Sequence, residues 1–254
     1  MKPTVIITRP KGPYAGDEGL SKRLVAEGFS PLPLSFLSVE ARELSDSEKG
    51  DIQSILSAPA SWIAFLSPTA VHVMRDLCAK IGCDLKESSV RIAAQGPGTS
   101  DAVRNLFSRE VDLESSIATA EVFAEQLALR LGGTGRVLVP QSAEGRDVFG
   151  PMLRDTGVDV RCIATYGLVT VAPTQQEVDA VRACSVEDSF IVFMSPSAVR
   201  ATVENFPDPE HLKCLRAISV GPSTSKALRE AGLKVFAEAI EHTESGVVEC
   251  LKRA

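Results

Sequence analysis

The chain has 254 residues, of which 44% are hydrophobic and 24% are charged, and its formal net charge is −6. This acidic balance argues against nucleic acid as a partner, because nucleic-acid binding usually leaves a basic footprint on a protein. No apolar run approaches the roughly 20 residues that a membrane span requires. We therefore expect neither nucleic acid nor a membrane as partner, and the length allows one large domain or two modest ones.

Short β-branched runs alternate with amphipathic helical stretches along the whole chain. Strands that are apolar throughout and separated by helices are typical of parallel sheets covered on both faces. The sequence therefore predicts an α/β fold with doubly wound parallel sheets. In chain order, the predicted strands are 4–8, 62–67, 90–94, 136–140, 190–195, 217–221 and 234–237, and the clearest helical patterns are 69–82, 120–133 and 197–206.

The chain contains an internal repeat. "FLSPTAV" at 65–71 returns as "FMSPSAV" at 193–199, and "GPGTS" at 96–100 returns as "GPSTS" at 221–225. A third pair, "VIITRP" and "VLVPQS", precedes these two in the same order and at nearly constant spacing. Such a duplication predicts two similar α/β domains. "GGTG" at 132–135 has the composition of a linker, so the residues alone favour two contiguous lobes cut at that point.

The repeated motifs lie where strands run into helices. Each serine-proline pair fits an N-cap followed by the first helical position. In a parallel sheet these junctions share one edge, where unpaired N–H groups and the helix dipole attract anions. Every hydroxyl is equally consistent with a plain cap, and each arginine with a surface ion pair. The candidate anion-binding residues are Arg9, Ser67, Thr99, Arg146, Ser195, Ser197, Gly221 and Thr224.

Familiar catalytic and cofactor motifs are missing. The sequence has no complete dinucleotide fingerprint, no phosphate-binding loop of the GxxxxGK[ST] type and no GxSxG nucleophile turn. Its six cysteines form no CxxC pair, and its three histidines stand far apart, so we expect free thiols and no metal site. Because the cofactor-binding motifs are missing, we expect no cofactor. Because the N-terminal apolar run lacks a cleavage site, we expect a cytoplasmic protein.

The ordered motifs resemble the uroporphyrinogen-III synthase family along essentially the whole chain. The residues that carry the resemblance are "ITRP", "FLSPTAV", "GPGTS", "LRDTGVDVRCIATYGLV", "FMSPSAV", "GPSTSKALREAG" and "HTESGVVECLKR". Gln95 departs from the pattern, since the family usually has an aliphatic residue before this Gly-Pro turn.

The resemblance implies a cofactor-independent lyase that closes hydroxymethylbilane, a linear tetrapyrrole with eight carboxylates, into uroporphyrinogen III. Water leaves the terminal hydroxymethyl group, and the resulting azafulvene is attacked through a spiro intermediate that inverts the last ring. Eight carboxylates suit an edge of helix N-termini. The family places a functional tyrosine at Tyr166, whose phenol would hydrogen-bond the departing hydroxyl or, alternatively, only pack in a connecting strand.

The resemblance also implies an exchanged topology. Residues 1–35 and 172–254 would form one domain and 36–171 the other, with connecting segments near 31–39 and 163–171 that permit hinge motion. We adopt this arrangement over the cut at 132–135 and expect 4–8 to pair in the sheet of 190–195 and 217–221. We expect a monomer with a small-molecule substrate; the alternative is a non-catalytic two-lobed binder or sensor of an anionic metabolite.

Overall fold

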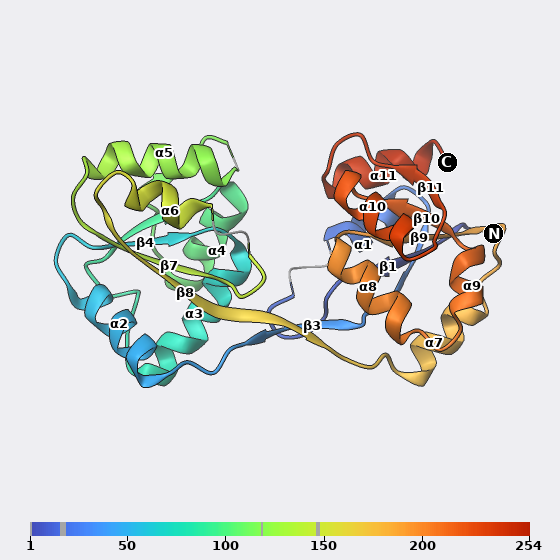
Figure 1. The fold of residues 1–254 in the computed structure, drawn as a ribbon, viewed down its shortest axis with the longest axis horizontal. Helices are drawn as coiled ribbons and strands as arrows, with labels where there is room; N and C mark the ends of the chain where they lie inside the picture. Colours follow the sequence, from blue (N-terminus) through green and yellow to red (C-terminus); the bar gives the residue numbers. More distant parts are fainter. Residues whose placement is uncertain (1, 16–18, 118, 146–147) are drawn as a thin grey trace. The chain divides into compact units, whose positions relative to one another are not determined.

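The structure is a computed structural model that describes residues 2–15, 19–117, 119–145 and 148–254. The chain divides into two compact units (Figure 1). Unit 1 comprises Met1–Val39 and Val169–Ala254, and unit 2 comprises Glu40–Leu168. Among the described residues, no helix has the length and apolarity needed to cross a bilayer.

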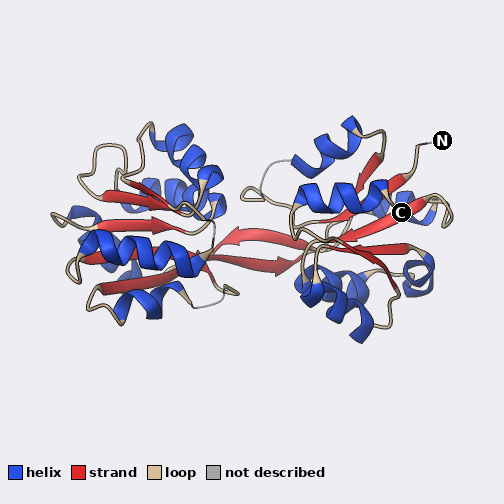
Figure 2. Cartoon of the chain, turned by 90° about the horizontal axis from the view of Figure 1, so that it is seen from above, coloured by secondary structure: helices blue, strands red, loops and turns tan. Residues whose placement is uncertain are grey.

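Unit 2 is built on a six-stranded sheet whose order is β3-β8-β7-β4-β5-β6. The strands from β8 to β6 all run parallel to their neighbours. Helices lie on both faces of the sheet (Figure 2). The strands are β3 (Leu37–Ala41), β4 (Trp62–Phe65), β5 (Arg91–Ala94), β6 (Leu113–Glu114), β7 (Arg136–Ser142) and β8 (Asp159–Thr170); the helices are α2 (Asp46–Ser57), α3 (Pro68–Ile81), α4 (Pro97–Phe107), α5 (Ala120–Leu131) and α6 (Phe149–Arg154).

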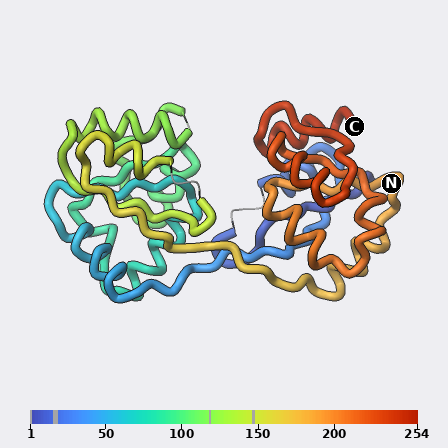
Figure 3. Tube along the Cα trace, viewed as in Figure 1, coloured from blue at the N-terminus to red at the C-terminus, as the bar shows by residue number. Residues whose placement is uncertain are grey.

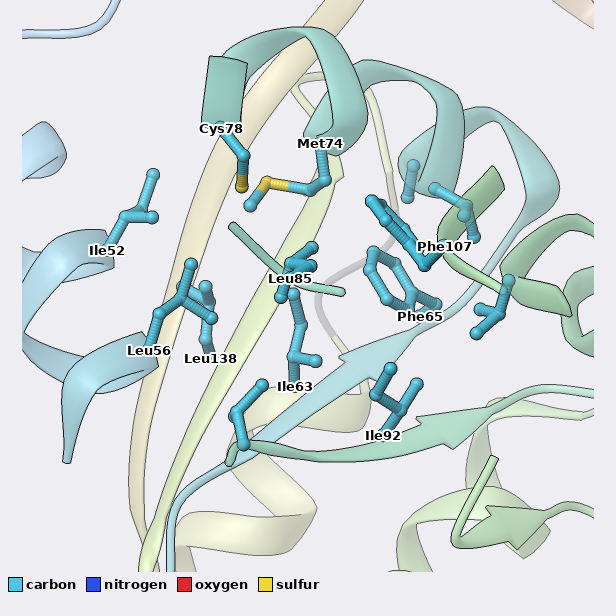
Figure 4. Packing of buried hydrophobic residues seen from close by; sticks show 14 of the residues in the cluster. Ile52, Leu56, Ile63, Phe65, Met74, Cys78, Leu85, Ile92, Phe107 and Leu138 are labelled. Atoms are coloured by element: carbon cyan, nitrogen blue, oxygen red, sulfur yellow. The ribbon is translucent and has the colours of Figure 1, made fainter. Parts of the chain in front are cut away.

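Side chains of β4 point alternately to the two faces of the sheet and contribute to both hydrophobic cores of unit 2. Ile63 and Phe65 point into the cluster formed with α2, α3 and α4 (Figure 4). Trp62 and Ala64 point the other way, into the cluster formed with α5 and α6. All four side chains are at most 2% exposed. Side chains of a strand alternate between faces, so a run that is apolar at every position becomes buried on both sides.

Unit 1 is a fully parallel five-stranded sheet of order β11-β10-β9-β1-β2. Helices α1 and α11 pack on one face through a shared hydrophobic cluster, and α8 and α10 pack together on the other. The strands are β1 (Thr4–Thr8), β2 (Ser30–Pro33), β9 (Ser189–Phe193), β10 (Arg216–Ser219) and β11 (Val235–Glu238); the helices are α1 (Gly19–Ala26), α7 (Gln175–Arg182), α8 (Pro196–Asn205), α9 (Pro209–Cys214), α10 (Pro222–Glu230) and α11 (Glu244–Lys252).

Strand pairing agrees with the exchanged arrangement. β1 lies beside β9, with Thr4 opposite Ser189 and Thr8 opposite Phe193, as predicted for residues 4–8. The N-terminal segment, blue in Figure 3, accordingly runs among the orange and red C-terminal elements. The contiguous cut at 132–135 is wrong: Gly132 caps α5 in the left-handed conformation (φ 63°), and β7 then returns beside β4.

The predicted connecting segments prove to contain regular strands. β3 and β8 run in opposite directions, because Val171 N–H donates to the Phe36 carbonyl (3.0 Å) and Arg42 N–H to the Thr165 carbonyl (2.8 Å). β8 is 12 residues long. The division between the units falls within β3 and within β8.

Candidate functional site

Two serines cap helices in the same way, one in each unit. Ser67 precedes α3 with φ −159° and ψ 156°, and its Oγ accepts from Ala70 N–H at 3.2 Å. Ser195 precedes α8 with φ −161° and ψ 157°, and its Oγ accepts from Ala198 N–H, also at 3.2 Å. Proline at the first helical position follows each serine, where its missing N–H costs nothing.

Tyr166 is joined to the first of these caps. Its Oη lies 3.0 Å from Ser67 Oγ, and its ring packs partly against the core cluster of unit 2. Ser67 Oγ already accepts from Ala70 N–H, so its own proton is available to donate to Tyr166 Oη. In that arrangement the Tyr166 hydroxyl can donate its proton to a further acceptor.

Burial raises the pKa of the Tyr166 phenol above its ordinary value of 10, and the Glu144 carboxylate raises this pKa further, while the hydrogen bond with Ser67 offsets part of the effect. Glu144 lies close to the same stretch of β8, since its Oε1 accepts from Leu168 N–H at 3.2 Å. The phenol is therefore protonated at neutral pH and has a proton to donate in a hydrogen bond.

A cavity of about 350 Å³ opens at this carboxyl edge of the unit 2 sheet. Ser67 and Tyr166 line it together, with side chains from the ends of β5 and β7 and from the start of α5. Its described lining contains no lysine and no arginine. The lining residues are Leu66, Ser67, Gln95, Thr119, Ala120, Glu121, Gln141, Ser142, Gly145, Val148, Phe149 and Tyr166.

Thr99 does not present its hydroxyl to this cavity. It is 2% exposed, and its Oγ1 donates to the Gln95 carbonyl at 3.3 Å. The turn before it depends on Gly96, which caps α4 at φ 84°, a conformation that favours glycine. The first turn of α4 has no side-chain cap. Its Thr99 N–H donates to the Gly96 carbonyl at 3.2 Å and Pro97 has no N–H, so among these leading groups the Gly98 N–H is the one left for solvent or a ligand.

In unit 1 the corresponding residues have different partners. Ser195 Oγ lies 3.0 Å from Ser197 Oγ. Gly221 precedes α10 in extended backbone, and the His242 ring packs so closely that a Cβ at position 221 would lie 2.8 Å from its Cδ2. Thr224 is 1% exposed, and its Oγ1 has no hydrogen-bond partner among the described residues.

The two predicted arginines differ in what the structure says of them. Arg9 follows β1 in unit 1 and forms an ion pair with Glu244, with Nη1 2.5 Å from Oε1. Both side chains are about one-third exposed, so Arg9 is partly neutralised by a neighbour that sequence reasoning did not anticipate. Arg146 lies outside the described residues.

Sequence reasoning missed several residues of the cavity. Gln95, Gln141 and Glu121 line it. Gln95 and Glu121 lie outside the repeated motifs, and Gln141, although it lies within "VLVPQS", was not among the predicted site residues. The available signal was position, because each follows or ends a strand or opens a helix at the edge where ligands bind in α/β sheets. All six cysteines are free, as predicted. The described residues contain no cluster of three or more potential metal-ligating side chains.

Comparison with known proteins gives a consistent family. The model of the family described as uroporphyrinogen-III synthase HemD matches residues 18–249. A relative from Methanocaldococcus jannaschii, provisionally named uroporphyrinogen-III synthase, is 21% identical over 251 residues, which is 98% of this chain and 97% of the relative.

Two solved structures have a similar fold. Uroporphyrinogen-III synthetase from Helicobacter pylori matches with a TM-score of 0.61 at 17% identity, covering 98% of this chain and 97% of its own. A mutant uroporphyrinogen III synthase from Thermus thermophilus matches with a TM-score of 0.56 at 17% identity and the same coverage. At these identities the match establishes the fold.

Proposed function

The chain belongs to the uroporphyrinogen-III synthase family, and from that premise we propose that it closes hydroxymethylbilane into uroporphyrinogen III with the cavity of unit 2 as a reacting site. Enzymes of this family are cofactor-independent cyclising lyases. The observation that carries the proposal is the contact between Tyr166 Oη and Ser67 Oγ at the N-terminus of α3.

Tyr166 assists the loss of water in this proposal. The C–O bond of the terminal hydroxymethyl group breaks as the electron-rich pyrrole supplies electrons, and the hydroxyl leaves as water with one proton. The later loss of a proton from the attacked ring balances this uptake. Tyr166 hydrogen-bonds the departing oxygen, and Ser67 donates to Tyr166, so a chain of donors runs from Ala70 N–H to the substrate.

The remaining predicted residues act in substrate binding by position. Helices α3, α4, α8 and α10 begin at the carboxyl edges of their own sheets, where unpaired N–H groups suit carboxylates. Ser67 and Thr99 belong to this set in unit 2, and Ser195, Ser197, Gly221 and Thr224 in unit 1. Arg9 and Arg146 would add positive charge, Arg9 only after release from Glu244.

Cyclisation without inversion needs little help, so the enzyme's main task is to hold the substrate in one conformation. We further propose that the protein works as a cytoplasmic monomer without a cofactor. The domain assignment follows the exchanged topology, with 1–35 and 172–254 against 36–171, and the strand pairing of β1 with β9 supports it.

The decisive experiment is incubation of purified, chelator-treated protein with freshly prepared hydroxymethylbilane, followed by separation of the isomers. The expected product is mainly the inverted type III isomer, formed faster than in buffer. Type I isomer alone, formed at the buffer rate, would contradict catalysis. Binding of hydroxymethylbilane without conversion would instead favour the two-lobed binder.

A further inference from the structure

The side chain of Gln95 makes no hydrogen bond to the residues that the structure describes. Both hydrogen bonds that Gln95 makes to described residues involve its main chain: its N–H donates to the Phe65 carbonyl at 2.9 Å, and its carbonyl accepts from Thr99 Oγ1 at 3.3 Å. Gly96 follows with φ 84° and ψ 171°, a backbone conformation that favours glycine. The backbone at 95 is thus fixed, while the amide lines the cavity with Ser67 and Tyr166.

The internal repeat offers a comparison. Val220 occupies the position in unit 1 that Gln95 occupies in unit 2, directly before the Gly-Pro turn. Its N–H donates to the Phe193 carbonyl at 3.1 Å, which matches the bond made by Gln95 N–H to Phe65. An apolar side chain therefore makes the same main-chain bond before a Gly-Pro helix start, although Gly221 is extended where Gly96 has φ 84°. The side-chain amide of Gln95 is not needed for that bond.

The lining of the cavity favours donors on the ligand. Gln95, Gln141 and Thr119 supply neutral oxygens, and Glu121 supplies a carboxylate, while no lysine or arginine is present in the described lining. A carboxylate arm of the substrate would be repelled by the Glu121 carboxylate. A pyrrole N–H, which only donates, would meet acceptors instead.

We propose that the cavity takes the reacting pyrrole ring by its N–H edge and that Gln95 Oε1 accepts this N–H. The inference rests on the proposed function. A volume of about 350 Å³ is near the lower end for small-molecule sites, which suits one substituted ring rather than all four. As the hydroxyl leaves, positive charge spreads to the ring nitrogen and its N–H becomes a stronger donor. The bond to Gln95 therefore strengthens in the transition state and raises kcat.

Two substitutions with opposite chemistry test this role. Gln95→Met keeps the length of the side chain but removes the acceptor, and kcat should fall about 10- to 100-fold with KM changed less than about threefold. Gln95→Glu keeps acceptors and adds negative charge, so kcat should stay within about threefold of wild type. Gln176→Leu, an exposed glutamine on α7, is the control and should match wild type. Gln95→Leu replaces Gln95→Met if the latter does not fold.

Each contrary outcome is informative. If Gln95→Glu is slower than Gln95→Met and its KM is raised, the cavity binds a carboxylate and the proposal is overturned. Wild-type kcat in Gln95→Met also overturns it. Wild-type protein is assayed alongside: type III product from wild type with no effect at 95 removes only Gln95, whereas type I product alone from wild type removes the proposed function itself.

Discussion

At the carboxyl edges of the two sheets, nearly identical sequence motifs start a helix in each unit, but the capping serines of these motifs contact different residues. Ser67 and Ser195 cap their helices with almost identical dihedral angles and with equal Oγ to N–H distances of 3.2 Å. Beyond the caps the edges diverge. Ser67 contacts Tyr166 from β8, whereas Ser195 contacts Ser197 two residues along. The local motif forms the N-cap of the helix, whereas in unit 2 the further hydrogen-bond partner of the capping serine comes from a segment distant in sequence.

The threonines three positions into α4 and α10 diverge in the same manner. Thr99 donates to a carbonyl in its own turn, while Thr224 is buried without a partner among the described residues. A buried hydroxyl without a partner is costly unless something satisfies it. Thr224 is therefore the member of this pair with an unmet hydrogen bond, and Thr165 of β8 in unit 2 is a second buried hydroxyl without a partner among the described residues.

The largest expected effect comes from a glycine that only unit 1 requires. A Cβ at Gly246 would lie 1.9 Å from the Glu241 carbonyl oxygen, whereas a Cβ at Gly98 in α4 would meet nothing within 4 Å. Gly246→Ala should therefore cost about 3 kcal/mol of unfolding free energy, the upper range for overpacking. Gly98→Ala should leave stability unchanged or raise it by up to about 1 kcal/mol. Urea denaturation of both variants measures this, and equal stabilities would refute the contrast.

Tyr166→Phe should impair turnover far more than folding. Keeping the ring preserves its packing, so the loss of one hydrogen bond should change stability by about 1 kcal/mol. Loss of the donor to the departing hydroxyl should lower kcat by about 10- to 1000-fold. Turnover and urea denaturation are measured on the same preparation. Wild-type turnover would remove Tyr166 from the chemistry and leave positioning by helix N-termini as the whole catalytic account.

The raised pKa of Tyr166 sets the sign of a pH effect. Because the folded protein disfavours the phenolate, the contribution of the protonated phenol to stability is fully present below pH 10 and is lost as pH rises through the raised pKa. Turnover by wild type should consequently show no loss attributable to Tyr166 below pH 10. A pH–rate profile with a descending limb near neutral pH that disappears in Tyr166→Phe would contradict the raised pKa.

Six of the seven strands that sequence patterns predicted are largely buried, and the seventh, predicted at 234–237, is β11, whose side chains are half-buried or exposed. β1, β4, β5, β7, β9 and β10 are apolar runs, and all lie close to their predicted ranges. The missed strands carry weaker signals. β2 (Ser30–Pro33) contains two prolines at a sheet edge, and β6 has only two residues. In β8 buried positions are separated by half-buried or exposed ones, and most of the segment expected to be a simple connection lies within this 12-residue strand.

For the site, motifs located the helix starts but not the contacts between them. Both serine caps and both Gly-Pro turns stand where predicted, because capping depends on neighbouring residues. The contact of Tyr166 with Ser67 joins residues 99 apart in sequence, and Arg9 reaches Glu244 across 235. Such pairs follow from the strand order of each sheet, which local patterns do not contain.

Replacing each capping serine with alanine compares the two units directly, and the expected effects are of intermediate size. Ser67→Ala and Ser195→Ala should each cost about 0.5–2 kcal/mol, the usual range for a lost N-cap, as measured by urea denaturation. Their effects on turnover should differ. Ser67→Ala removes the hydrogen-bond partner of Tyr166 Oη and should lower kcat a further ~3- to 10-fold relative to Ser195→Ala. Equal turnover in the two variants would show that the donor chain through Ser67 has no catalytic part.

The smallest expected effect on stability distinguishes the buried threonines at the starts of α4 and α10. Valine matches threonine in shape, so Thr99→Val should cost about 1 kcal/mol through its lost bond to the Gln95 carbonyl. Thr224→Val removes a hydroxyl that has no partner among the described residues and should be neutral or stabilising by up to about 1 kcal/mol. If a substrate carboxylate satisfies this hydroxyl, Thr224→Val should also raise KM by about 3- to 10-fold while the protein itself is no less stable. Urea denaturation and steady-state kinetics on both variants decide the matter: a destabilised Thr224→Val with wild-type KM would mean that the hydroxyl serves the fold of unit 1 and not its ligand.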